Sequence, residues 1–538
     1  MRKILCTVFA MMYMTIYSAA AASCGGFRLA QDGTYAEEYL GGEAAACFPA
    51  SVVKADYNLF QEGAESIRQL TLPPLMKEVP GLKNCVNLEK IEVPQDNAAF
   101  AGVDGVLYSR DLSQLIYYPR GKRDAAFQIP DSVREIAGGA FFGNPYLEEV
   151  VLPAGVASIG AENFTDCSAL REIRPEEGNA AFTAQNGALY TSDCKTLIAV
   201  PAGNSGAFTV PEGTEKIAYG AFSGCSGLTE LHLAETLTQI EAMAFAGCTG
   251  LRAITLPAAL EQASAASFAG CSNLEAVYVE HSDYFQTRDG ILYSRDMIDL
   301  IFCPAGKKGS IVLPDGVQNI ANGAFDNCRE MTALILPESV TALGRAFLNC
   351  ENLEYISIPE TISIIDYCTF MGCTGLEWVY FPNNVVIIKD KVFAGASPVI
   401  YCDEDSYAEM YAQDNGLPYQ YMIRVELNGE PMLFDQPPVL VNDTTLVPLR
   451  AIFEALGAAV QWDGEQMTAQ MGQQTAEVTV GGDIMYATAA DGTENTVRLD
   501  APAQLVNDRV LAPLRAVSEA FGADVQWDEN AKMVLIAK

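Results

Sequence analysis

The sequence predicts a β-rich repeat solenoid of short parallel strands with an irregular convex side, followed by a small α+β domain made of two copies of one motif. An apolar phrase returns about every 23 residues from 65 to 398, and a different, duplicated segment occupies 423–538. One repeat cannot bury its own apolar face, whereas stacked repeats share a continuous core. With 538 residues, the chain is also too long for one ordinary core.

Residues 1–23 have the pattern of an export signal. Arg2 and Lys3 precede the apolar run Ile4–Tyr17, and small residues follow at Ala19–Ala22. The apolar run is too short to cross a membrane as a mature helix. Cleavage near Ala22 would release a soluble chain, and the alternative is a weak lipobox that ends at Cys24 and adds a lipid anchor. Both routes predict an extracellular or cell-surface location.

Residues 24–64 lack the repeat phrase and are expected to form an N-terminal cap. The phrase itself reads AFSGCSGLTELHL from Ala221, AFAGCTGLRAITLP from Ala244 and AFLNCENLEYISIP from Ala346. Its L-x-x-I-x-L part alternates apolar residues, as a strand with one inward face does, and the following proline ends the strand. About fourteen coils stacked at about 4.8 Å would give a solenoid about 65 Å long.

A second unit interrupts the repeats three times. It reads GVLYSRDLSQLIYYPRGK from Gly105, GALYTSDCKTLIAVPAGN from Gly187 and GILYSRDMIDLIFCPAGKK from Gly290. Two short apolar runs flank a polar turn in each copy, which predicts a hairpin together with an extra coil.

One position of the phrase carries a cysteine in eight coils and an asparagine in one. Because a thiol and an amide can both hydrogen-bond to turn backbone groups, we expect this cysteine slot to point into the coil. Disulfide bonds and a catalytic thiol are the alternatives, and the pairing of the other cysteines stays open. The slot residues are Cys85, Asn144, Cys167, Cys225, Cys248, Cys271, Cys328, Cys350 and Cys373.

Four aromatic residues fall at outward strand positions and form the candidate ligand surface: Tyr278, Tyr355, Trp378 and Tyr380. Aromatic side chains with a polar edge suit contacts with sugars or peptides. The alternative is that they pack on neighbouring coils or on the C-terminal domain. The net charge of -35 disfavours nucleic acid and anionic polymers, so the expected partner is an extracellular protein or a neutral glycan.

The phrase, its period and the hairpin insertions resemble the BspA-like branch of bacterial leucine-rich repeats over residues 65–422. The segment VIYCDEDSYAEMYAQDNGLPYQYM, at 399–422, is similar to the terminal strand, short helix and strand of that family. The resemblance implies a solenoid with a C-terminal cap on a surface protein.

The duplicated segment reads VLVNDTTLVPLRAIFEALGAAVQWD from Val439 and QLVNDRVLAPLRAVSEAFGADVQWD from Gln504. Each copy predicts a strand, a helix and a strand. It resembles the stalk domain named after the N-terminal region of copper amine oxidases, which implies a spacer or a module near the cell wall. Amine oxidase activity is not implied, because the whole chain has only two histidines, His232 and His281, and neither lies in 423–538.

No nucleophile, metal or phosphate-binding motif was found, so no cofactor, no metal and no catalysis are expected. No later segment is long and apolar enough to span a bilayer. The sequence therefore predicts a secreted or cell-surface interaction protein, adhesin-like, in which the solenoid binds a ligand. A structural envelope spacer without a specific ligand is the alternative, and an enzyme is the third and least supported class.

Overall fold

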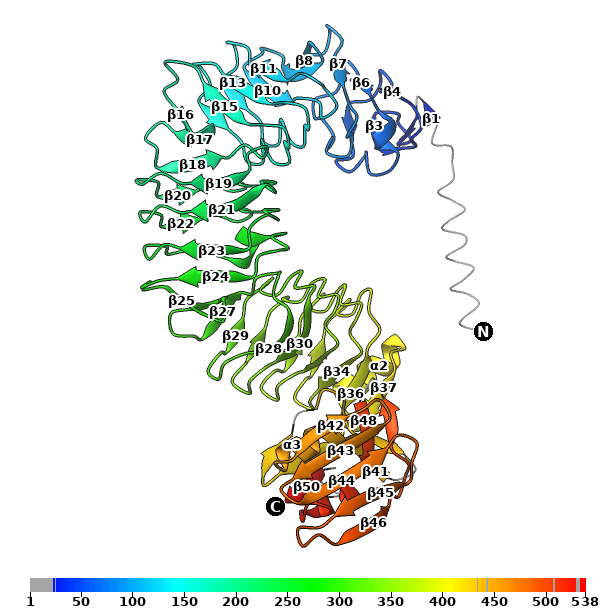
Figure 1. The fold of residues 1–538 in the computed structure, drawn as a ribbon. Helices are drawn as coiled ribbons and strands as arrows, with labels where there is room; N and C mark the ends of the chain where they lie inside the picture. The colour runs from blue at the N-terminus through cyan, green and yellow to red at the C-terminus, as the bar shows by residue number, and fades with distance from the viewer. Residues whose placement is uncertain (1–22, 25, 433, 442–443, 507–508, 529–532) are drawn as a thin grey trace, which may run out of the picture. The chain divides into compact units, whose positions relative to one another are not determined.

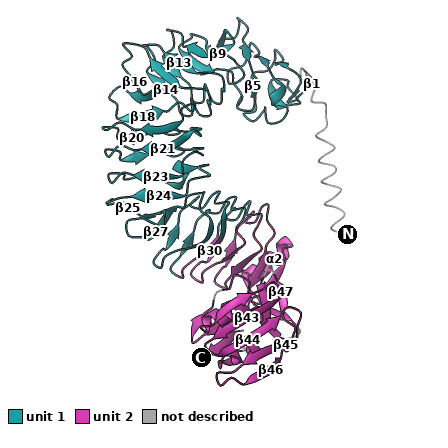
Figure 2. Ribbon diagram, in the orientation of Figure 1, with its two compact units in different colours: residues 1–332, 339–352, 366–374 teal, residues 333–338, 353–365, 375–538 magenta. Residues whose placement is uncertain are grey.

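The computed structural model describes residues 23–24, 26–432, 434–441, 444–506, 509–528 and 533–538 (Figure 1). Contacts divide the chain into two units (Figure 2). The first holds the described residues up to 332 with 339–352 and 366–374, and the second holds 333–338, 353–365 and the rest from 375. The predicted signal lies outside the described residues apart from the backbone of β1 (Ser23–Cys24), so cleavage and acylation stay predictions.

The L-x-x-I-x-L segments form short parallel strands, as predicted, and we call them the first ladder. In β23 (Ala253–Leu256) and β24 (Ala276–Val279), residues pair in register from Ala253 with Ala276 to Leu256 with Val279. Ile254 and Val277 face inward and are buried. The other members are β6 (Gln69–Thr71), β7 (Lys90–Glu92), β11 (Ala126–Gln128), β13 (Glu149–Leu152), β15 (Glu172–Pro175), β19 (Gly206–Thr209), β21 (Leu228–His232), β28 (Gly309–Val312), β30 (Met331–Ile335), β32 (Tyr355–Ser357), β34 (Trp378–Phe381) and β36 (Val399–Cys402).

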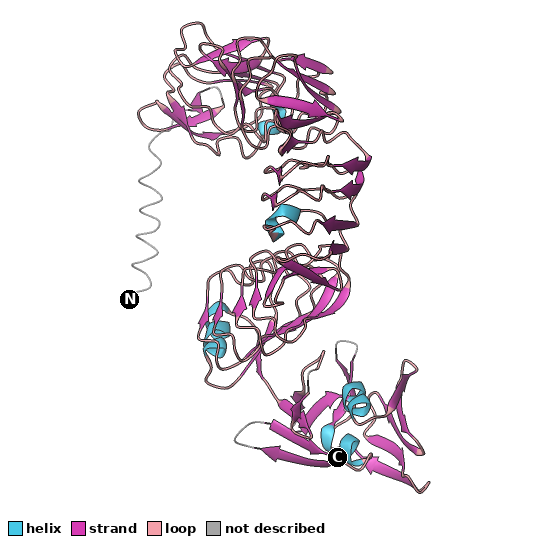
Figure 3. Ribbon diagram, turned by 90° about the vertical axis from the view of Figure 1, so that its left-hand side faces the viewer, coloured by secondary structure: helices cyan, strands magenta, loops and turns pink. Residues whose placement is uncertain are grey.

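The opposite side of the coils carries a second ladder of two-residue strands. Ile136 of β12 (Glu135–Ile136) pairs in parallel with Ile159 of β14 (Ser158–Ile159). This side is otherwise irregular, with the single-turn helices η1 (Ala64–Ser66) and η2 (Ala265–Phe268) (Figure 3). The other members are β20 (Lys216–Ile217), β22 (Gln239–Ile240), β29 (Asn319–Ile320), β31 (Ala342–Leu343), β33 (Ile364–Ile365) and β35 (Ile387–Ile388).

Each insertion is a three-stranded antiparallel sheet, one strand more than a simple hairpin. In the first, Asp104 and Gly105 take φ angles of 49° and 80°, as a two-residue turn with the twist of a hairpin requires. The third strand, β10 (Gln114–Tyr117), pairs in parallel with β12, so the insertion continues into the second ladder. The other strands are β8 (Phe100–Val103), β9 (Val106–Ser109), β16 (Phe182–Gln185), β17 (Ala188–Thr191), β18 (Thr196–Ala199), β25 (Phe285–Arg288), β26 (Ile291–Ser294) and β27 (Asp299–Phe302).

All nine residues of the cysteine slot are at most 1% exposed. The thiol of Cys248 donates to the carbonyl of Phe222 at 3.2 Å, and the thiol of Cys271 donates to that of Phe245 at 3.0 Å. Burial raises the pKa of Cys271 to about 12. The thirteen cysteines from Cys47 to Cys402 are free thiols.

In the same slot, the side chain of Asn144 makes more hydrogen bonds than a cysteine thiol does. Its amide nitrogen donates to the carbonyls of Pro119, Arg120 and Lys122 at 3.0, 3.1 and 2.9 Å. Its oxygen accepts from the backbone nitrogens of Tyr146 and Leu147, both at 2.9 Å. Asn144 therefore makes three bonds to the preceding turn and two within its own coil, whereas the thiols of Cys248 and Cys271 each make one bond to the preceding coil.

The sequence predicted that the solenoid starts at residue 65, but the first ladder begins earlier, at residue 45. β4 (Ala45–Cys47) pairs in parallel with β6, and Ala64 is fully buried at the position of the cysteine slot. The nitrogen of Ile67 donates to the carbonyl of Ala64 at 3.2 Å, as that of Leu88 does to Cys85 at 3.1 Å. The N-terminal cap is the sheet of β1, β2 (Phe27–Leu29), β3 (Tyr35–Tyr39) and β5 (Lys54–Ala55), of which β5 follows β4 in the sequence.

The end of the solenoid is a strand, a helix and a strand, namely β36, α2 (Tyr407–Asn415) and β37 (Tyr419–Tyr421). The hydroxyl oxygen of Ser406 accepts from the nitrogen of Glu409 and caps α2, and Gly416 ends it in the left-handed region with φ of 66°. β37 pairs in parallel with β36.

The duplicated segment forms a two-copy α+β domain. Each copy runs from a strand directly into a short helix: β41 (Thr444–Pro448) into α3 (Leu449–Ala455), and β48 (Arg509–Pro513) into α4 (Leu514–Glu519). β41 and β48 pair antiparallel, and the rings of Phe453 and Phe521 lie 5.3 Å apart. A five-stranded meander, β42–β46, joins the copies: β42 is the predicted strand after the first helix, and β43–β46 were not predicted. The remaining strands are β38 (Arg424–Leu427), β39 (Glu430–Pro431), β40 (Val439–Val441), β42 (Ala459–Trp462), β43 (Gln466–Met471), β44 (Gln474–Thr479), β45 (Ile484–Thr488), β46 (Glu494–Arg498), β47 (Gln504–Val506), β49 (Asp524–Asp528) and β50 (Met533–Ala537).

Candidate functional site

Three of the four predicted aromatic residues lie together in the second unit. Tyr355 of β32 pairs in register with Trp378 of β34. Their rings stack with centroids 5.0 Å apart and planes 9° apart. Tyr401 of β36 meets Trp378 edge-on at 5.7 Å. The same face of adjacent strands thus presents a compact aromatic cluster, as the 23-residue period predicts.

This cluster is covered, which corrects the expectation that Trp378 and Tyr380 are accessible. Trp378 is 4% exposed and Tyr380 is 7% exposed, and Tyr355 is half-buried. The indole nitrogen of Trp378 donates to the backbone carbonyl of Asp435 at 3.3 Å. The alternative interpretation, in which these rings pack on the C-terminal domain, matches the contacts of Trp378 and Tyr380.

Two arginines complete the cover. Arg424 of β38 donates to the hydroxyl of Tyr380 at 2.9 Å and forms ion pairs with Glu360 at 2.9 Å and Asp403 at 3.3 Å. Burial, followed by the charge of Asp403, raises the pKa of Tyr380 well above its ordinary value. Arg509 of β48 forms an ion pair with the side chain of Asp435. A ligand could reach Trp378 or Tyr380 only if these contacts opened.

Asp435, Arg424 and Arg509 were not among the residues predicted to form the site. Asp435 lies between the two recognisable modules, and Arg424 follows the repeat, so no period marks either of them. Arg509 did carry a signal. The two copies are offset by 65 residues, and the position equivalent to Arg509 in the first copy is Thr444. The replacement of threonine by arginine between the two copies is therefore the sequence signal for the residue that pairs with Asp435.

Tyr278 is accessible, with 50% of its surface exposed on β24 in the first unit. It ends a row of exposed side chains at 23-residue spacing, Thr209, His232, Thr255 and Tyr278, which we call the Tyr278 row. Thr209 pairs in register with His232, and Thr255 pairs with Tyr278.

The second outward row of the same strands has small side chains apart from Glu230. It consists of Ala207, Glu230, Ala253 and Ala276, of which Ala207 pairs with Glu230 and Ala253 pairs with Ala276. The carboxylate of Glu230 lies 3.1 Å from the ring nitrogen of His232. Small neighbours leave the ring of Tyr278 open to a ligand, so Tyr278 is the most accessible of the four predicted residues.

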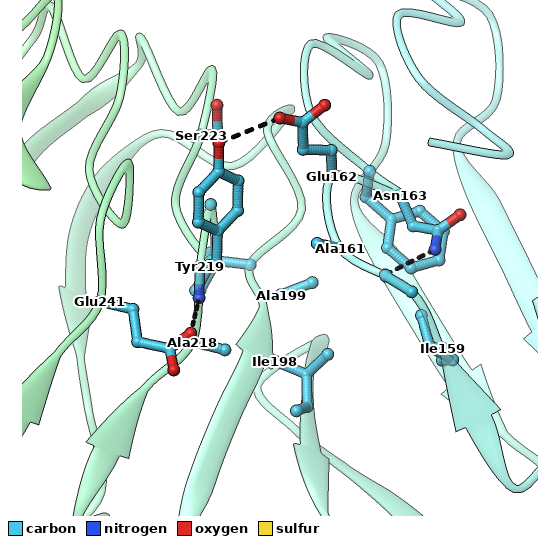
Figure 4. Close-up of a pocket in the computed structure, with 15 residues that line it drawn as sticks. Ile159, Ala161, Glu162, Asn163, Ile198, Ala199, Ala218, Tyr219, Ser223 and Glu241 are labelled. Carbon is cyan, nitrogen blue, oxygen red and sulfur yellow. Dashed lines mark hydrogen bonds between the residues drawn. The ribbon is translucent and has the colours of Figure 1, made fainter. Parts of the chain in front are cut away.

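The first unit also contains a cavity of about 170 Å³ beside the second insertion (Figure 4). It opens where the insertion separates β14 from β20, and its wall is mostly alanine, glycine and isoleucine. The hydroxyl of Tyr219 donates to Glu162 at 3.1 Å, and its nitrogen donates to Glu241 at 2.8 Å. A hydrogen bond from Lys83 lowers the pKa of Glu162. Since both carboxylates already have partners, the cavity offers no free acid or base from them.

Comparison with known proteins agrees with this architecture. The family model described as the BspA type leucine rich repeat region matches in 6 copies, over residues 124–200, 202–303 and 296–401, which is more than half of the chain. The chain belongs to the BspA-type leucine-rich-repeat family. A second model, the copper amine oxidase N-terminal domain, matches residues 426–536 of this BspA-type protein.

Solved structures similar to this BspA-type protein include a leucine rich cell surface protein of Faecalibacterium prausnitzii, with 22% identity and a TM-score of 0.38 over 74% of this chain and 98% of that one. A leucine-rich repeat protein of Eubacterium ventriosum shares 16% identity, with a TM-score of 0.40 over 69% and 94% of the two chains. The pneumococcal vaccine antigen PcpA shares 18% identity, with a TM-score of 0.37 over 71% and 82%. No curated protein matched the sequence.

Within the described residues of this BspA-type protein, no helix combines the length and apolar character needed to cross a membrane. No group of three or more His, Cys, Asp or Glu side chains in that part is placed to hold a metal ion.

Proposed function

We propose that this protein is an exported, non-enzymatic surface protein whose solenoid binds an extracellular protein or a neutral glycan. The C-terminal domain would act as a spacer or as a module near the cell wall. The observation that carries the proposal is the Tyr278 row, an open strand face with an exposed aromatic ring among small side chains. Solenoids generally use such faces for ligands.

The chemistry of this face indicates the class of ligand. Tyrosine, histidine and threonine offer hydroxyl and imidazole groups together with an aromatic ring, which suits sugars and peptides. The net charge of -35 disfavours nucleic acid and anionic polymers through long-range repulsion. A neutral glycan or a protein therefore fits best.

The test is a binding titration of the full-length protein against a panel of neutral glycans and extracellular matrix proteins. Tyr278→Ala should weaken binding to any ligand found by about 1–3 kcal/mol, as truncation of an aromatic anchor typically does. Tyr486→Ala is the matched control, because Tyr486 is 55% exposed on β45 of the C-terminal domain. Equal affinities of the two variants and the parent would contradict binding through the Tyr278 row.

A structural spacer without a ligand is the second candidate. The burial of Trp378 and Tyr380 favours it, because their rings stabilise a junction where the sequence suggested a binding site. Retention of the protein at the cell surface together with no binding to the whole panel would support the spacer.

A further inference from the structure

The last strand of the first ladder is open along one side. β37 (Tyr419–Tyr421) pairs with β36 and lies at the end of its sheet, and all three of its residues are exposed. An edge strand of this kind presents a row of unpaired backbone groups that another strand can use.

The two flanking hydrogen bonds show which groups are unpaired. The nitrogen of Ile400 donates to the carbonyl of Pro418 at 2.8 Å, and the nitrogen of Met422 donates to that of Cys402 at 2.9 Å. Backbone groups of alternate residues point to opposite sides of a strand, so Gln420 also bonds toward β36. The N–H and C=O groups of Tyr419 and Tyr421 point away from it, and no described residue bonds to them.

The side chains of β37 continue the interior of the solenoid. Ile400 pairs in register with Tyr419, and Cys402 pairs with Tyr421. Ile400 and Cys402 are fully buried, whereas Tyr419 and Tyr421 are 37% and 47% exposed. The inward row therefore ends on two partly uncovered rings, and a strand added beside β37 would place alternate side chains on them.

Hydrogen bonds to helix α2 orient the rings of Tyr419 and Tyr421 in the unbound protein. The hydroxyl of Tyr421 donates to Glu409 of α2 at 2.9 Å, and Gln413 donates to the hydroxyl of Tyr419 at 3.1 Å. Gln413 also donates to the Glu409 carboxylate at 3.0 Å. An immobilised aromatic pair loses little side-chain entropy when a ligand packs on it.

The charge around this edge selects the partner. Residues 399–424 contain five carboxylates and one arginine, Arg424, which pairs with Asp403, so the segment carries a net charge of -4. The edge of a second copy would bring another -4 against it, so self-association through β37 is disfavoured. A partner strand with basic flanking residues is favoured.

We propose that β37 is a strand-addition site for an extended segment of another protein. The segment has apolar side chains at two alternate positions, which pack on Tyr419 and Tyr421, and lysine or arginine on both sides. Main-chain hydrogen bonds supply affinity and the two ring contacts supply selectivity, as in other cases of strand addition. This site is separate from the Tyr278 row, and its existence does not depend on a ligand there.

The test uses the full-length protein and the labelled peptide KKTVTVTKK, followed by fluorescence anisotropy at low and high salt. Binding should be saturable and should weaken at high salt, because the flanking charges are exposed. The same peptide N-methylated at the residues whose N–H groups face β37 should bind at least 10-fold more weakly, whereas methylation on the other side should have little effect. Two single-side methylated peptides therefore distinguish strand pairing from charge attraction alone.

Variants of the protein complete the test. Tyr421→Ala removes one ring, and Tyr421→Pro removes in addition an N–H that faces away from β36, a position at which proline is tolerated. Affinity should fall in that order, while Tyr486→Ala should bind as the parent does. Circular dichroism and melting curves establish that each variant is folded. The proposal is overturned if the parent does not bind, if both methylated peptides bind equally, or if Tyr421→Pro binds as the parent does.

Discussion

The indole nitrogen of Trp378 and the backbone carbonyl of Asp435 form a hydrogen bond across 57 residues of sequence. It joins strand β34 of the solenoid to the segment between β39 and β40 of the C-terminal domain, and both lie in the second unit. This hydrogen bond and the ion pair between Arg509 and Asp435 would both have to break before the C-terminal domain could separate from β34.

Trp378→Ala should destabilise the second unit by about 3–5 kcal/mol, because it leaves a large void and removes the stacking partner of Tyr355. Differential scanning calorimetry would show a lowered melting temperature. Tyr278→Ala, at an exposed position, should change stability by no more than about 0.5 kcal/mol. Unchanged melting of Trp378→Ala together with weakened ligand binding would restore Trp378 as a ligand contact.

Asn144→Ala should cost more than Cys248→Ala. The cysteine variant loses one hydrogen bond and a small volume, at about 1–3 kcal/mol. The asparagine variant leaves three carbonyls and the nitrogens of Tyr146 and Leu147 without their partner, at about 3–5 kcal/mol. Urea unfolding of both variants measures the difference, and the reverse order would mean that the slot is sensitive to volume alone.

The buried thiols should resist modification in the folded protein and react after denaturation without reductant. Burial raises the pKa of Cys85, Cys167 and Cys225 to about 12, so their reactive thiolate forms are scarce below that pH. Cys47, which is exposed, should react in the native state and serves as the internal control. Mass spectrometry after iodoacetamide treatment checks this, and disulfides among the slot cysteines would contradict it.

The same shifts predict a loss of stability in alkaline solution. A thiol with a folded pKa near 12 and an unfolded value near 9 contributes its full stability below pH 9. Above pH 9 the unfolded state releases protons that the folded state retains, so stability should fall as pH rises from 9 towards 12. Urea titrations at pH 8 and pH 10.5 measure the change, and equal stability at both would show that the thiols ionise freely when folded.

The C-terminal domain, residues 423–538, should bind no stoichiometric copper and oxidise no amine. A Cu(II) site prefers imidazole nitrogens, and residues 423–538 contain neither histidine nor cysteine. Equilibrium dialysis with Cu(II), with a His-rich peptide as positive control, is the measurement. One tight copper per chain would refute the prediction.

N-terminal sequencing of exported material should find a cut between Ala20 and Cys24, because small residues follow the apolar run there. Metabolic labelling with a fatty acid distinguishes an acylated Cys24 from a soluble product. An intact Met1 on surface material would exclude processing.

The repeat architecture could be predicted because one strand pattern and one cysteine slot recur about every 23 residues between the insertions. The first coil was missed for a local reason, since Ala64 replaces cysteine and an extra residue separates it from Phe60. The slot requires a small buried side chain, and alanine meets that requirement without any recognisable motif.

The burial of Trp378 could not be predicted in the same way. Periodicity tells which side of a strand a residue faces, and Trp378 does lie on the outward side, beside Tyr355. What covers that side depends on Asp435 and Arg509, which are non-repetitive and distant in sequence. The strands β43–β46 were missed because their buried side is mostly alanine and methionine, which gives a weak apolar alternation: Met467, Ala469, Ala476, Val478 and Met485.

The 23-residue interval that aligns the Tyr278 row has a consequence for how such a chain can change length. Gain or loss of one whole coil would shift every later coil along the stack by one step and leave each side chain on its original face. Gain or loss of a single residue within a strand would move the following side chains of that strand to the opposite face, so that inward residues would point outward. Genetic duplication in whole multiples of the coil is therefore a structurally neutral route to longer or shorter family members, and binding faces can be extended without being redesigned.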